Sequence, residues 1–204
     1  MEKILGDVLT WPWFSEPHGY NFNGLLIPAP DGNICIDPVE PNEEVMSELV
    51  ARGVSRILLT NRNHLRAANR IREGTGARTY IHPEDAAHAK SQGGALDGEL
   101  HEGETIGAFK VIGVSGKSPG EVAFLWTERK ALIVGDAVVG NPPGKLSLLP
   151  ERVMDDPARL RRSVQRLLAL DFDTILVGDG VSIIGGAKQR LKELVDSFGI
   201  AASS

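Results

Sequence analysis

The chain has 204 residues, of which 42% are hydrophobic and 24% charged, an ordinary composition for a globular protein. Its length suits one domain over residues 1–204, and its net charge of -5 argues against general affinity for nucleic acid or an anionic membrane. No stretch resembles a signal peptide or approaches the roughly 20 apolar residues of a membrane helix. Cys35 is the single cysteine and lies in an apolar run, so we expect a buried, inert thiol and a reducing, cytoplasmic location.

The first half of the chain reads as strands and helices in alternation. The expected strands are residues 23–27, 33–36, 56–60 and 78–81, and the expected helices are residues 41–52, residues 65–73 and a third that begins at His82. Glycines 53 and 74 follow the first two helices, where a C-terminal glycine belongs. The aromatic-rich residues 11–20 read as a loop, which either anchors the N-terminus or forms a lid over a ligand.

The second half continues the same pattern after a glycine-rich segment. Residues 91–107 read as a surface loop with a short hairpin. The expected strands are residues 109–114, 121–126, 131–134 and 174–177, and the expected helices begin at Asp156-Pro157 and cover residues 186–198. Alternation of this kind favours an α/β fold, and nothing indicates a repeat or a linker.

The chemically informative residues follow the ends of these strands. The first group is residues 57–66, ILLTNRNHLR. The second comprises residues 114–122, VSGKSPGEV, and residues 131–137, ALIVGDA. The third is residues 174–180, TILVGDG. Functional groups gather at the carboxyl ends of strands in α/β proteins, so we expect these three segments to meet at one edge.

These segments resemble the metallo-β-lactamase superfamily, with its T-H-x-H-x-D-H, G-H-S/T-P-G, G-D and G-H-G motifs in that order. The resemblance covers nearly the whole chain, from Asn23 to Leu194. It implies a metallo-β-lactamase-like α/β fold, a four-layer αββα sandwich. Three motifs in the same order are a far more specific signal than any one of them.

The departures from the family pattern fall on its metal ligands. Set against the motifs, the ligand positions hold Asn61, Asn63, Leu65, Arg66, Lys117 and Asp179, and only Asp136, the family's bridging aspartate, is kept. Zinc prefers imidazole, thiolate and carboxylate ligands, whereas an amide is a poor ligand and a cation repels the ion. The sequence therefore predicts no metal ligands and no cofactor, zinc least of all, and leaves open only a single weak metal at Asp136 and Asp179.

The same replacements suggest an ion-pair cluster. A lone buried carboxylate is costly, and Arg66 and Lys117 are placed to supply positive charge to Asp136 and Asp179. We predict at least one such contact at hydrogen-bonding distance. The pocket is expected to contain Asn61, Asn63, Arg66, Lys117, Ser118, Asp136 and Asp179.

Three residues are candidates for catalysis, namely Lys117, Asp136 and His64. Lys117 could act as a base or a Schiff-base nucleophile, but neighbouring carboxylates would raise its pKa and keep it protonated, which favours a structural salt bridge. His64 falls on a spacer position of the family motif, which favours a loop or helix-start histidine over a ligand. His82 is expected to cap a helix, and His88 and His101 to lie on the surface.

These observations leave three hypotheses. The favoured one is a metal-free pseudoenzyme that binds a small molecule or a protein. The alternative is a hydrolase with a remodelled or single-metal site that uses Asp136, Asp179 and His64. The third is a non-hydrolytic enzyme built on Lys117 and Asp136. Trp11, Trp13 and Phe14, read as exposed, would suit a homodimer interface, and the oligomeric state and the ligand stay open.

Overall fold

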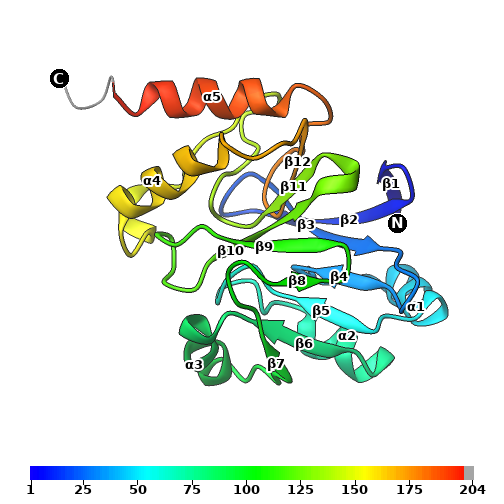
Figure 1. Ribbon diagram of the computed structural model, residues 1–204. Coiled ribbons are helices and arrows are strands. Elements are labelled where there is room, and N and C mark those ends of the chain that lie inside the picture. The colour runs from blue at the N-terminus through cyan, green and yellow to red at the C-terminus, as the bar shows by residue number, and fades with distance from the viewer. Residues whose placement is uncertain (200–204) are drawn as a thin grey trace. The chain divides into compact units, whose positions relative to one another are not determined.

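A computed structural model describes residues 1–199 of the chain (Figure 1). The chain divides into two compact units, Met1–His101 and the segment that begins at Glu102. Each unit contains one β-sheet, its own helices and its own hydrophobic core, and each is described by itself. Whether the two units act as one domain, as the sequence predicts, stays a prediction.

The first unit is built on a seven-stranded sheet whose strands follow one another in chain order. Strands β1 to β4 are antiparallel neighbours, and β4 to β7 are parallel. The parallel strands are joined by helices, as parallel pairing requires. The elements are β1 (Glu2–Leu5), β2 (Val8–Ser15), β3 (Tyr20–Ile27), β4 (Ile34–Ile36), α1 (Glu43–Arg52), β5 (Arg56–Leu58), α2 (Ala68–Thr75), β6 (Arg78–Ile81), α3 (Pro83–Ser91) and β7 (Gly98–Glu99).

The ends of helices α1 and α2 are set by individual capping residues. The side chain of Asn42 accepts a hydrogen bond from Val45 N at 2.8 Å, and Gly53 ends α1 as predicted. Helix α2 was predicted too early, because the chain makes turns as far as Ala67, with Arg66 at a left-handed φ of 29°. It ends at Gly76, which is left-handed, and not at Gly74.

The aromatic segment near the N-terminus is a β-hairpin, so its interpretation as a loop was wrong. Strand β2 pairs with β3 from Leu9↔Leu26 to Ser15↔Tyr20. Pro12 is tolerated there because β1 reaches only as far as Thr10, so that β2 is an edge strand at Pro12. Trp11 is only 2% exposed and therefore cannot serve as an interface anchor.

The second unit contains a five-stranded sheet in the order β12-β11-β10-β9-β8, with helices packed on its buried side chains. All neighbours are antiparallel except β11 and β12. The elements are β8 (Thr105–Ile106), β9 (Phe109–Gly113), β10 (Val122–Trp126), η1 (Thr127–Arg129), β11 (Ala131–Val134), η2 (Glu151–Val153), α4 (Pro157–Leu167), β12 (Thr174–Val177) and α5 (Ala187–Ser197).

The hairpin predicted within residues 91–107 is placed differently in the structure. Strand β8 pairs with β9 across a turn at Gly107, which has a φ of 58°, while β7 pairs in parallel with β6. Local glycine content predicted a hairpin in this segment, but its turn and its second strand lie at and beyond the end of the segment. Among the described residues, no helix is long and apolar enough to cross a membrane.

Candidate metal site

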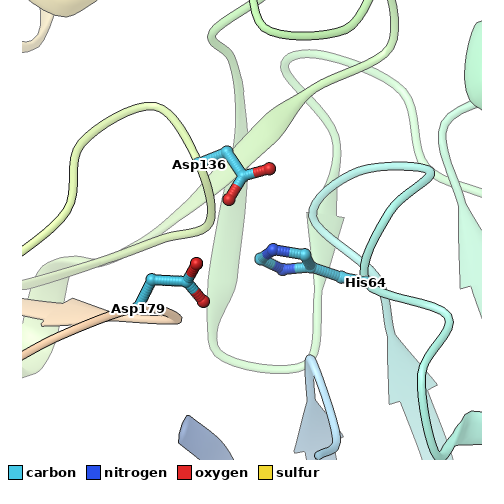
Figure 2. A group of neighbouring side chains, drawn as sticks. All are labelled: His64, Asp136 and Asp179. Carbon is cyan, nitrogen blue, oxygen red and sulfur yellow. The ribbon is translucent and has the colours of Figure 1, made fainter. Parts of the chain in front are cut away.

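Two buried aspartates follow the paired strands β11 and β12 of the second unit. These strands run in parallel, with Val134 opposite Val177, and Gly178 N donates to Val134 O at 2.9 Å. Asp136 and Asp179 therefore leave the sheet at the same edge. A carboxylate oxygen of each lies within 4.8 Å of one on the other, and each residue is 4% exposed (Figure 2).

The backbone after β12 is held by a close approach between two loops. Gly140 N donates to Asp179 O at 2.9 Å. Gly180 has a φ of 87°, and a Cβ added there would lie 2.5 Å from Gly140 O. Only glycine fits this position, and its neighbour Asp179 is thereby fixed beside Asp136.

The loop between β9 and β10 supplies a buried cation to the same edge. Gly116 has a φ of 143°, and a Cβ there would lie 2.3 Å from Leu160 N, so the loop packs directly against the start of α4. Lys117 follows, 4% exposed, with its Nζ 2.9 Å from Oδ2 of Asp136. The predicted contact between a replacement cation and a strand-end carboxylate is confirmed. The neighbouring Ser118 is fully buried.

The first unit holds its own buried polar network at the ends of β4 and β5. His64 has no exposed surface, and its Nδ1 lies 2.8 Å from Oδ2 of Asp37. Thr60 donates to the same carboxylate through its backbone N at 2.8 Å and its Oγ1 at 2.6 Å. Figure 2 also draws the His64 side chain. Asp37 was missed as a site residue, although it follows an apolar strand just as Asp136 and Asp179 do.

The other pocket residues predicted in the first unit, Asn61, Asn63 and Arg66, differ in their exposure and contacts. Asn61 is fully buried, and its Oδ1 accepts from Asn63 N at 2.8 Å, whereas Asn63 itself is exposed. The guanidinium of Arg66 lies over the ring of Phe22, 4.2 Å from its centroid. A cavity of about 310 Å³ adjoins this pair, lined by Trp13, Phe22, Val39, Glu40, Arg66 and Ala67.

His82, His88, His101 and Cys35 lie as predicted. His82 caps α3 by accepting a hydrogen bond from Glu84 N at 3.3 Å, and His88 and His101 are exposed. Cys35 is fully buried, and burial raises the pKa of its thiol far above the usual value.

Residues 3–198 match the family described as the metallo-beta-lactamase superfamily. The chain belongs to this superfamily. The predicted metallo-β-lactamase-like α/β fold is confirmed, and a solved DIM-1 metallo-β-lactamase shares the fold, with a TM-score of 0.78 at 16% identity over 97% of this chain and 96% of that one.

Two further relatives of this metallo-β-lactamase superfamily member carry chemical information. A hydroxyacylglutathione hydrolase from Fuscovulum blasticum is 30% identical over 83% of this chain, which spans 64% of that enzyme's length. The protein TTHA1623, solved in a di-iron-bound form, is 26% identical, with a TM-score of 0.68 over 89% of this chain and 98% of that one.

These relatives overturn one prediction and weaken another. The prediction of no metal cofactor is wrong, because a hydroxyacylglutathione hydrolase and a di-iron protein of similar sequence point to a metal. The metal-free pseudoenzyme is likewise not supported. The charge argument treated Lys117 as a cation that repels a metal, but its charge is matched by Asp136 at 2.9 Å.

The donor chemistry of this chain fits a metal ion. Within the second unit, Asp136 and Asp179 offer carboxylate oxygens, a ligand type that iron, manganese and zinc accept. Counting replacements at the family's ligand positions gave too little weight to this pair of carboxylates.

Proposed function

We propose that this chain is a metal-dependent hydrolase with a remodelled site for one divalent ion, held by Asp136 and Asp179 of the second unit. The observation that carries the proposal is the pair of aspartates, in a member of the metallo-β-lactamase superfamily. Both are buried to the same extent, and a carboxylate oxygen of one lies within 4.8 Å of a carboxylate oxygen of the other. Two carboxylates this close repel each other unless positive charge is shared between them. Lys117 supplies one positive charge, and a divalent ion would supply the rest.

The residues around Asp136 support one ion in place of two. Asp136 stands at the position of the family's bridging aspartate, and here the ammonium of Lys117 contacts its Oδ2 at 2.9 Å. A lysine in that place contributes one of the two positive charges that a second divalent ion would bring, in a fixed position and without further ligands.

The chemistry follows from the ion and from the residues that hold it. A bound divalent ion polarises a carbonyl oxygen and lowers the pKa of a bound water toward neutrality. Lys117 holds the Asp136 carboxylate in one orientation, and the burial of both excludes bulk water from their contact. The hydrogen bond from Gly140 N to Asp179 O fixes the backbone of the second aspartate.

The substrate class that we propose is a thioester of a hydroxy acid. Support comes from the relative in Fuscovulum blasticum, which is named for hydrolysis of hydroxyacylglutathione. The chain spans only 64% of that relative's length. We therefore propose the thioester bond as the substrate class and assign no particular thiol.

Hydrolysis of a hydroxyacylglutathione thioester tests the proposal directly. Purified protein is stripped with chelator, reloaded in parallel with zinc, manganese or ferrous iron, and assayed for thiol release. We expect activity in at least one loaded form, none in the stripped form, and a loss of at least about 100-fold in Asp179→Asn, as expected when an ion-binding group is removed. Asp171→Asn is the matched control, because its side chain is 74% exposed in the same unit. Full activity in the stripped protein, or no hydrolysis in any loaded form, would reject the proposed function.

A further inference from the structure

A cavity of about 300 Å³ lies beside strand β9 of the second unit. None of the residues that line it belongs to the proposed metal site. Its volume is at the lower end of the range of small-molecule sites, which is about 300–1,000 Å³. Part of the lining is aliphatic, with Ile112 from β9, Leu167 at the end of α4 and Leu170 just after it. Ile112 and Leu170 are only partly buried, so they leave apolar surface for a ligand to cover.

Arg166 brings to this cavity a guanidinium whose donors the protein uses only weakly. A guanidinium has five N–H donors. Those of Arg166 make two long hydrogen bonds, both from Nη2, to Gly113 O at 3.4 Å and to Ser163 Oγ at 3.5 Å. Within residues 1–199, no carboxylate forms an ion pair with Arg166. The guanidinium can therefore accommodate an added carboxylate, which it binds best through two parallel N–H···O bonds.

Glu102 brings a carboxylate to the same cavity, close to the same glycine. A Cβ added at Gly113 would lie 2.5 Å from Oε2 of Glu102, so the missing side chain at this position lets the carboxylate reach the strand. Glu102 and Arg166 thus both approach Gly113, yet in the described part of the chain they form no ion pair with each other. Lys110 also lines the cavity, so cations outnumber anions there. Opposite charges that line one small cavity without neutralising each other favour a ligand that carries both charges.

We propose that this cavity binds an α-amino acid with an aliphatic side chain. The carboxylate of the ligand accepts hydrogen bonds from Arg166, and its ammonium donates to Glu102. Its alkyl group covers the apolar surface of Ile112 and of the leucines at the end of α4. Every residue of this site belongs to the second unit, and the proposal does not depend on the proposed hydrolase function.

Titration of the unmodified chain with L-leucine, followed by ¹H–¹⁵N NMR, measures both the affinity and the place of binding. We expect saturable shifts of the backbone amides of Gly103 and Gly113, which line the cavity. Leucinamide lacks the carboxylate and 4-methylpentanoate lacks the ammonium, and each should bind at least about 10-fold more weakly, as when a charge-assisted hydrogen bond is lost. The proposal is overturned if L-leucine causes no saturable shift at these glycines, or if either analogue binds as tightly as L-leucine.

Two variants assign the ends of the ligand to their partners. Arg166→Gln should weaken L-leucine binding at least about 10-fold and abolish its preference over leucinamide, and Glu102→Gln should do the same with 4-methylpentanoate as the comparison. Arg162→Gln is the matched control, because it removes the same charge from the same helix at an exposed position that does not line the cavity. Its affinity should stay within about 2-fold, since exposed charges are screened by salt. Equal affinities of Arg166→Gln and Arg162→Gln would overturn the site, and if a variant does not fold, the two analogues decide the matter on the unmodified chain.

Discussion

Removal of the buried ammonium at position 117 should destabilise the second unit strongly. Lys117→Met keeps much of the side-chain volume and removes only the charge. The two partners of the pair have side chains that are 5% and 6% exposed, and they lie 2.9 Å apart. Removing one partner of a buried ion pair costs about 3–5 kcal/mol, because the other charge is left without compensation.

Thermal unfolding in the presence of chelator is the appropriate assay, since a bound ion would offset the loss. For a chain of this size, 1 kcal/mol corresponds to a shift of about 2–4 °C in Tm, so Lys117→Met should lower Tm by about 6–20 °C. The matched control is Lys192→Met, whose i,i+4 pair with Asp196 has side chains that are 56% and 60% exposed. An exposed pair of this kind contributes about 0.3–0.5 kcal/mol, or about 1–2 °C. Equal Tm values for the two variants would refute the assignment of Lys117 as the compensating charge of Asp136.

Three further predictions concern packing and reactivity. Gly116→Ala should destabilise the protein by more than about 1 kcal/mol, because the residue has a φ of 143° and an added Cβ would lie 2.3 Å from Leu160 N of α4. The control Gly199→Ala, where an added Cβ meets open space, should have little effect in the same thermal assay. Cys35 should not react with a disulfide reagent at pH 8 until the chain is unfolded, because burial raises the pKa of its thiol, and rapid labelling of native protein would contradict this. Trp11→Phe should cost about 1–3 kcal/mol through loss of its buried 3.0 Å hydrogen bond to a backbone carbonyl, and Trp13→Phe, 43% exposed, should unfold at the unmodified Tm.

The strand-end motifs were predictable because their geometry is set by local pattern. Continuous apolar runs that end in Gly-Asp predict buried strands with a carboxylate at the carboxyl end, and β11 and β12 are such strands. Their parallel pairing brings Asp136 and Asp179 together, as the family resemblance implied. The contact of Lys117 with Asp136 was predicted from the resemblance, which placed both residues in one pocket, and from charge, since a buried carboxylate needs a partner.

Two features were not predictable from the sequence for physical reasons. Strand β2 contains Pro12, which argues against a strand unless the neighbouring strand is known to end before it. The buried state of His64 depends on Asp37, which is 27 positions away in the sequence and meets it only because β4 and β5 are parallel neighbours. The error over the metal has the same origin, since ligands were counted position by position along a motif and not by donor atoms in space.

Metal stoichiometry tests the central claim most directly. The protein is stripped, dialysed against buffered zinc, manganese or ferrous iron, and its metal content is measured by plasma mass spectrometry together with that of Asp136→Asn/Asp179→Asn. We predict one ion per chain for at least one of these metals, and loss of that ion in the double variant. Two ions per chain, or uptake by the double variant equal to that of the unmodified chain, would contradict a single site built on these carboxylates.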